Sequence, residues 1–293
     1  MSTQMLIYET AVPVSSGRHA KCSVEIGNAY AFTRNVNSVP LMAVEFPPAM
    51  AEYAIVFAGD AEQMMPVVIL GARQNENLYL AAEGAWQAKY IPAFVRRYPF
   101  VFSSSQDGKT FTLCVDEAFQ GVNYQGRGQA LFTEDGKPSP YTENVLKFLQ
   151  EYRAQFLRTQ AFCKKLREHD LLEPMQAEFT LGSGEKMALR GFTVVSRAKL
   201  KALSGEALAD LAKTDELELI YLHLQSVRNF TTVRDKLVLI QGGKSQQSPE
   251  AAGEAQHPEA AGEAEHPEAA GEAEQASPAA VGGKNAKRVR AEK

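Results

Sequence analysis

The sequence has few of the residues on which most metal-binding and redox proteins depend. Its 293 residues include three cysteines, five histidines and one tryptophan. Cys22, Cys114 and Cys163 lie far apart and form no CxxC pair, so we expect reduced thiols rather than a disulfide framework. His19 and Cys22 form one close pair, interpreted as a surface turn, because a structural zinc site needs four ligands. The sequence therefore predicts no metal and no cofactor.

Long apolar runs are also missing. The longest uncharged apolar stretch covers residues 64–72, about half of the roughly 20 residues that a membrane-spanning helix needs. Residues 1–16 have no basic segment followed by an apolar core, which is the pattern of a secretory signal. We therefore expect a cytoplasmic protein without membrane insertion.

Most of the chain has no excess of charge of one sign. The whole chain has 35 acidic and 31 basic residues, and residues 245–293 contain nine Glu and five Lys or Arg, so 26 of each sign remain in residues 1–244. Nucleic-acid binders need an excess of Lys and Arg to neutralise phosphates. The neutral body predicts that nucleic acid is not a partner.

A nine-residue unit repeats near the C-terminus, beginning at Pro249, Pro258 and Pro267. Each unit contains a proline and a glycine and no large apolar side chain, so it can neither propagate a helix nor supply a core. Gly242 and Gly243 precede this region. The sequence predicts one globular domain over residues 1–243 and a disordered tail over residues 244–293.

The hydrophobic pattern predicts an α+β fold. Short β-branched and aromatic runs before residue 132 indicate a mainly antiparallel sheet, with strands at 41–46, 53–58, 67–70, 78–82, 98–103 and 110–115 and short helices at 47–52 and 85–95. After Pro140 the period becomes helical, and Thr142 is a candidate N-cap. A hairpin over residues 175–195 and helices at 197–203, 206–213 and 217–237 follow, although residues 217–221 also alternate as a strand would.

Motifs for nucleotide binding and nucleophilic catalysis are incomplete. No P-loop occurs, and the glycine cluster at residues 121–128 has Leu131 where the third glycine of a dinucleotide-binding motif would fall. Cys114 is expected on the exposed side of its strand, where Asp116 and Glu117 would raise the pKa of the thiol and make it a poor nucleophile. The sequence assigns no catalytic residue, and whether the protein is an enzyme stays open.

Residues 86–100 form the most unusual segment, because they contain the only tryptophan, two adjacent arginines and four other aromatic residues. The candidate ligand-binding residues are Trp86, Tyr90, Arg96, Arg97 and Tyr98. The two arginines could bind an anion as a bidentate clamp, with aromatic rings stacked on their guanidinium planes. In the alternative interpretation, one arginine caps carbonyls at a helix end and the other pairs with a buried carboxylate.

Five short segments support a family assignment: Glu45-Phe46, Tyr90-Ile-Pro-Ala, Arg96-Arg-Tyr-Pro-Phe100, Cys114-Val-Asp-Glu117 and Leu171-Leu-Glu-Pro174. Together they resemble the SapC family of bacterial proteins. The resemblance covers roughly residues 5–240 and departs at Tyr53-Ala54, where Tyr-Pro is expected. The family takes its name from a surface-layer system. The resemblance therefore implies a role in a surface-layer or envelope and uptake process, without a reaction or ligand to transfer.

Two functional hypotheses remain. The first is a non-catalytic accessory or binding protein whose partner is another protein or a small anionic ligand. The second is an enzyme, or an enzyme partner, acting on a small anionic or peptide substrate held by the Arg-Arg-Tyr-Pro-Phe segment.

Overall fold

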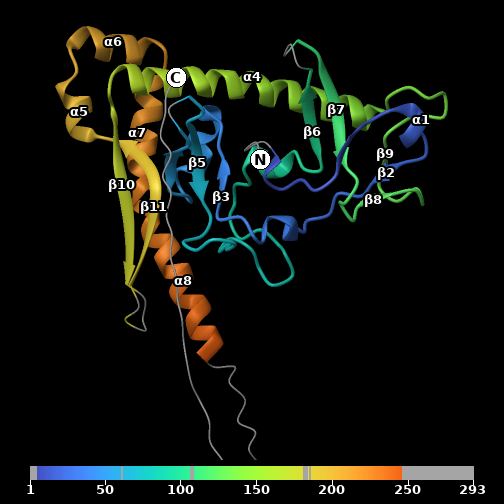
Figure 1. Cartoon of the computed structure of the whole chain (residues 1–293), viewed down its shortest axis with the longest axis horizontal. Helices are drawn as coiled ribbons and strands as arrows, with labels where there is room; N and C mark the ends of the chain where they lie inside the picture. The colour runs from blue at the N-terminus through green and yellow to red at the C-terminus, as the bar shows by residue number, and fades with distance from the viewer. Residues whose placement is uncertain (1–4, 61, 106–108, 181–183, 185, 246–293) are drawn as a thin grey trace, which may run out of the picture. The chain divides into compact units, whose positions relative to one another are not determined.

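Antiparallel sheets and one long helix organise the chain in the computed structural model, which describes residues 5–60, 62–105, 109–180, 184 and 186–245 (Figure 1). The fold is mixed α+β, as predicted. In the described residues, the largest sheet has the strand order β10–β11–β4–β5–β3 and the two smaller sheets have the orders β1–β7–β6 and β8–β2–β9.

The elements follow one another closely along the chain. The strands are β1 (Ala11–Pro13), β2 (Ser23–Val24), β3 (Ser38–Pro40), β4 (Ile55–Ala58), β5 (Met65–Ile69), β6 (Phe100–Ser104), β7 (Phe111–Asp116), β8 (Val122–Asn123), β9 (Gln129–Ala130), β10 (Leu172–Thr180) and β11 (Lys186–Val195). The helices are α1 (Ser16–His19), α2 (Phe46–Ala49), α3 (Ala93–Arg96), α4 (Pro140–Glu168), α5 (Arg197–Ala202), α6 (Gly205–Lys213), α7 (Glu216–Ser226) and α8 (Phe230–Ser245), with short 3-10 turns η2 (Ala31–Thr33), η3 (Ala43–Glu45) and η4 (Val227–Asn229).

The long helix α4 links the sheets, since it contacts β5 of the largest sheet and β6 of the next (Figure 1). Its N-cap is Ser139, whose hydroxyl accepts a hydrogen bond from the Thr142 backbone N–H at 3.2 Å, and Pro140 begins the first turn. The prediction of Thr142 as the N-cap is wrong by one turn. The Thr142 hydroxyl instead donates to the Leu131 carbonyl at 2.8 Å.

The core lies where helices cover the largest sheet. The Phe57 ring of β4 packs against Phe162 of α4 and His223 of α7, with ring centroids 6.2 and 5.0 Å apart. Both helices therefore cover the same face of the sheet at this point. Burying an aromatic or large aliphatic side chain contributes about 1.5–3 kcal/mol, so these contacts hold α4 in place over the sheet.

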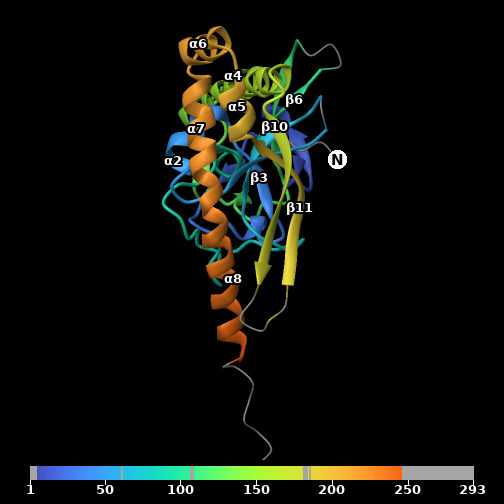
Figure 2. The same ribbon diagram turned by 90° about the vertical axis from the view of Figure 1, so that its left-hand side faces the viewer.

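The second half of the body folds largely as predicted. The hairpin of β10 and β11 is continuous with the largest sheet, and Figure 2 shows α7 and α8 running alongside it. Ser196 and Ser204 stand at the N-caps of α5 and α6. Residues 217–226 are helical, so the alternative of a strand there is wrong. Helix α8 continues through Gly242 and Gly243 to Ser245, and the predicted tail from residue 246 onward lies outside the described residues.

Three predicted elements in the first half are wrong. Residues 41–46 form η3 and the start of α2, because the Glu45 carboxylate accepts from the Met42 N–H at 2.8 Å and favours a tight turn. Residues 78–82 form turns, since the Asn77 side chain accepts from the Tyr79 N–H at 2.9 Å, and such local bonds compete with a strand ladder. Of residues 85–95, only those from Ala93 onward are helical.

In the part of the chain that the structure describes, no helix is both long enough and apolar enough to cross a membrane.

Candidate functional site

The five predicted ligand-binding residues lie close in sequence but face different surroundings. Tyr90 and Arg96 line one cavity, Arg97 lines a second and Tyr98 lines a third. Trp86 is part of an internal hydrogen-bond chain, since its Nε1 donates to the Tyr53 hydroxyl at 2.8 Å. The structure therefore does not bring all five residues together in one cavity.

Arg97 lies at the end of α3 and is only 4% exposed. Its guanidinium lies over the rings of Phe94 and Tyr152, with Cζ 4.5 and 4.8 Å from their centroids. The guanidinium also lies over the Tyr8 ring, with Cζ 5.6 Å from its centroid, and the Tyr8 hydroxyl donates to the Phe100 carbonyl at 2.6 Å. Burial raises the pKa of Tyr8 above its ordinary value, so this phenol stays neutral. Aromatic rings thus hold the guanidinium in one orientation.

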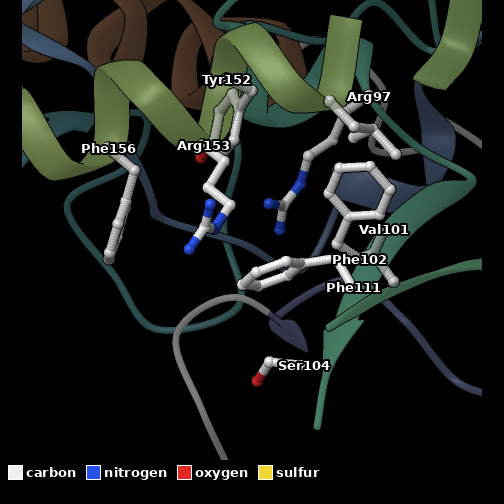
Figure 3. Close-up of a pocket in the computed structure, with 9 residues that line it drawn as sticks. Arg97, Val101, Phe102, Ser104, Phe111, Tyr152, Arg153 and Phe156 are labelled. Atoms are coloured by element: carbon white, nitrogen blue, oxygen red, sulfur yellow. The ribbon is translucent and has the colours of Figure 1, made fainter. Parts of the chain in front are cut away.

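Beside Arg97 lies a cavity of about 220 Å³ between α4 and β6 (Figure 3). Arg153, one turn along α4 from Leu149, is exposed and also lines the cavity. It lies over the Phe111 ring, with Cζ 3.7 Å from the centroid. The remaining walls are mostly apolar and include Val101, Phe102, Leu149, Tyr152 and Phe156. Figure 3 shows both guanidinium groups directed toward the space between these walls.

The electrostatics of this cavity favour a negative charge. Of the residues that line it, the two that carry a charge are Arg97 and Arg153. A guanidinium presents a planar set of donors that matches a carboxylate or a phosphate. Because the other walls are apolar, the field of the arginines is screened less than it would be in bulk water. The cavity can therefore hold a small molecule with an anionic group and an apolar body.

Arg96 faces away from this cavity. It is exposed, its Nε donates to the Ile91 carbonyl at 3.0 Å, and its Cζ lies 6.0 Å from the Tyr90 ring centroid and 5.4 Å from that of Phe148. Arg96 and Arg97 thus line different cavities. In the alternative interpretation, an arginine binds backbone carbonyls at a helix end. Arg96 does bind a backbone carbonyl, that of Ile91, but Ile91 precedes α3.

Two buried carboxylates organise this region. Glu45 accepts hydrogen bonds from the backbone N–H groups of Met42 and Ala93 and from the Tyr90 hydroxyl, at 2.8, 2.7 and 2.7 Å. Burial nevertheless raises the pKa of Glu45 above its usual range. Asp116, which is fully buried, accepts from the Tyr98 hydroxyl at 3.3 Å. These carboxylates bind Ala93 at the start of α3 and Tyr98 just after it, so they fix both ends of the short segment that contains Arg96 and Arg97.

A model of the SapC family matches residues 14–233. The chain belongs to the SapC family. No curated protein and no solved structure matches the chain. The match includes all of α3 and β6 and the part of α4 that lines the Arg97–Arg153 cavity, so this cavity lies within the SapC region.

The sequence prediction for this SapC protein missed three residues that matter to the site. Arg153 stands on α4 without any spacing that distinguishes it from other exposed arginines, and its partner ring, Phe111, lies 42 positions earlier in the sequence. In the sequence, Glu45 stands out only as part of the family resemblance. No local pattern indicates that its carboxylate accepts from three donors, because one of them, the Ala93 N–H, is 48 residues away.

Two expectations about reactive residues are wrong in this SapC protein. Cys114, expected to be exposed, is buried, with 3% of its surface accessible, because β7 is the central strand of its sheet. Burial, and not neighbouring carboxylates, raises the pKa of the thiol. His19 and Cys22 are both fully buried rather than on a surface turn. The His19 Nε2 lies 3.1 Å from the Glu117 carboxylate. In the described residues, no three His, Cys, Asp or Glu side chains are grouped as metal ligands would be.

Proposed function

We propose that this member of the SapC family is a cytoplasmic binding protein that catalyses no reaction itself and serves a surface-layer or envelope and uptake process. Its ligand is a small molecule with an anionic group and an apolar body, held in the Arg97–Arg153 cavity. The observation that carries the proposal is that a buried arginine and an exposed arginine face one cavity with aromatic walls.

The size and polarity of the cavity support this ligand class. About 220 Å³ is slightly below the roughly 300–1,000 Å³ of most small-molecule sites, so the ligand is small. The exposed Arg153 provides a donor group, while the buried Arg97 adds positive potential. The aromatic walls, Phe102, Phe111 and Phe156, provide apolar contact for the rest of the ligand.

The state of the nearby acidic groups supports binding rather than catalysis. Glu45 and Asp116 are buried and bound to internal donors, three for Glu45 and four for Asp116. A general acid or base must reach the substrate through its own polar atoms. Because these carboxylates stabilise loops, they hold the cavity in shape and do not face a ligand inside it.

Titration with probes of one shape and different charge tests the proposal. Benzoate and phenyl phosphate serve as anions, benzyl alcohol as the neutral probe and benzylamine as the cation, and calorimetry of the full chain measures binding. We expect saturable binding of the anions. Arg153→Gln should weaken it by about 10-fold to 100-fold, since a hydrogen bond to a charged group contributes about 1.5–3 kcal/mol.

Arg158→Gln is the matched control, because Arg158 is also exposed on α4 but does not line the cavity. Equal affinity of both variants for benzoate, or binding of benzyl alcohol as tight as that of benzoate, contradicts the proposed ligand class. Native mass spectrometry of the purified chain identifies any ligand it carries. Chemical conversion of an anionic ligand by the protein would contradict a binding-only role and favour the enzyme hypothesis.

A further inference from the structure

A separate cavity of about 570 Å³ is lined by Tyr98 and by residues of the loop after β7. The residues that give it chemical character are three aromatic rings, Phe32, Tyr98 and Phe119, and two carboxylates, Glu9 and Glu25. None of these residues lines the Arg97–Arg153 cavity. The two cavities therefore differ in the sign of their charged groups.

The aromatic rings of this cavity form a connected set around Tyr98. The Tyr98 ring stacks on Phe32 with centroids 4.2 Å apart and meets Phe119 edge-on at 5.3 Å. Its hydroxyl donates to the buried Asp116 carboxylate at 3.3 Å. The faces of aromatic rings are electron-rich and attract cations, and the rings of Phe32 and Phe119 are only partly buried.

The charged groups add to this preference for a cation. Among the residues that line the cavity, Glu9 and Glu25 are the charged ones, and both are acidic. The carboxylate of Glu25 lies 3.4 Å from an Arg127 Nη1, but both side chains are more than half exposed, and an exposed pair of this kind contributes little. Glu9 has its backbone N–H bound to Asp116 at 2.8 Å, which fixes its position at the rim.

The walls of the cavity are preformed. The Asp116 carboxylate accepts from the backbone N–H groups of Glu9, Thr10 and Ala118, at 2.8, 2.9 and 3.1 Å, in addition to the Tyr98 hydroxyl. One fully buried carboxylate thus joins the N-terminal segment, the loop after β7 and the central ring. A ligand that enters finds these groups already in position and loses little free energy to ordering them.

We propose that this cavity binds a small organic cation, an alkylammonium or quaternary ammonium compound, between the aromatic rings and the two glutamates. The cation lies against the partly buried ring of Phe119, beside Tyr98, and its charge is balanced by Glu9 and Glu25. This site is independent of the anion site in the Arg97–Arg153 cavity, so the protein presents two ligand sites of opposite charge preference.

Three probes of nearly equal size and different charge test the site: tetramethylammonium, tert-butanol and pivalate. Ligand-observed NMR and calorimetry of the full chain measure binding. Trp86 adds an internal reporter, because its ring lies 5.8 Å from Tyr30, which in turn lies 6.1 Å from Phe32. We expect saturable binding of tetramethylammonium with a change in tryptophan fluorescence, weaker binding as salt concentration rises, and no saturable binding of tert-butanol.

Two variants separate the contributions of charge and ring. Glu9→Gln removes one charge and leaves its backbone bond to Asp116, and it should weaken tetramethylammonium binding about 1.4-fold to 5-fold. Phe119→Leu keeps an apolar side chain but removes a ring face, which should weaken binding about 2-fold to 30-fold. Glu173→Gln, an exposed glutamate of β10, is the matched control and should bind as the wild type does.

The result that overturns the proposal is the absence of saturable tetramethylammonium binding to the wild type, or equal affinity for tert-butanol. An unchanged affinity in Glu9→Gln also overturns it, and this variant keeps the test valid if Phe119→Leu does not fold. Arg153→Gln should leave tetramethylammonium binding unchanged. Loss of binding in Arg153→Gln would place the cation elsewhere and contradict the site, whereas failure of the anion probes alone would not affect it.

Discussion

Acidification should destabilise the protein through one buried histidine, His223. It lies on α7, is fully buried, and its Nε2 accepts a hydrogen bond from the Val195 N–H of β11 at 3.0 Å. The Phe57 ring of β4 lies against it with centroids 5.0 Å apart. Burial lowers the pKa of His223 from 6.5 to about 4, because a charged imidazolium would lose its hydration and face a donor in place of an acceptor.

The sign and size of the effect follow from this pKa. Between pH 6.5 and about 4 the imidazole binds a proton in the unfolded chain but not in the folded one, so the free energy of unfolding falls as the pH falls. His223 stabilises the fold fully above pH 6.5, and this contribution is lost as the pH drops toward 4. The difference between the two pKa values corresponds to about 3 kcal/mol, a large part of the roughly 5–15 kcal/mol that stabilises a typical domain.

Urea unfolding at a series of pH values measures this loss, with Trp86 fluorescence and circular dichroism as probes. The variant His223→Gln keeps an acceptor for the Val195 N–H but has no group that titrates in this range. We expect it to be less stable than the wild type at pH 7, and to lose about 2–3 kcal/mol less stability between pH 7 and pH 4.5. Other acidic groups titrate in both proteins and cancel in the comparison.

Parallel loss of stability in the wild type and in His223→Gln would refute the reasoning, because it would mean that the imidazole is protonated as easily in the folded protein as in the unfolded chain. A steeper loss of stability in His223→Gln than in the wild type would mean that the histidine protects the fold against acid, which is the opposite of the expected effect. Either result would show that His223 does not carry the acid sensitivity.

Two other substitutions test the internal contacts. Glu45→Gln should lower the free energy of unfolding by about 1–3 kcal/mol, because an amide NH₂ would replace one of the oxygens that accept from three internal donors. Thermal unfolding measures this loss. The control is Glu151→Gln, at an exposed residue of the same cavity, which should change the stability little. Gly128→Ala should destabilise the fold severely, because φ is +82° and the new Cβ would overlap the backbone of β2. Gly126→Ala has a similar φ of +74° but open space around it, so it should lower the free energy of unfolding by only roughly 1–2 kcal/mol. Equal melting temperatures within either pair would contradict these contacts.

The elements that the sequence predicts correctly are those whose signals are local and periodic. Strands β4 and β5 are short β-branched and aromatic runs, the hairpin of β10 and β11 has turn residues at its centre, and α4 repeats apolar residues at helical spacing. The wrong elements depend on distant partners. Residues 85–92 do not continue a helix, since the carboxylate of Glu52 accepts from the N–H groups of Lys89 and Tyr90, and no pattern in the segment itself indicates that acceptor.

The candidate sites follow the same rule. Residues 86–100 stand out by composition, so a sequence can draw attention to them, but composition does not say which side chains share a cavity. Phe111 and Arg153 belong to the proposed anion site only because β6 pairs with β7 and α4 contacts β6. Glu9 belongs to the proposed cation site only because Asp116, 107 residues later, binds its backbone.

The divergence of Arg96, Arg97 and Tyr98 has a simple geometric cause. Successive residues of a helix point about 100° apart, and α3 ends at Arg96, so Arg97 at its C-cap turns toward α4 on a different side. Strand β6 begins at Phe100, and Tyr98 lies in the connection, where the chain has already left the helix. These three adjacent residues lie at a junction between a helix and a strand, and they therefore line three cavities rather than one. A clamp that binds one anion with both arginines would require the helix to end at a different residue.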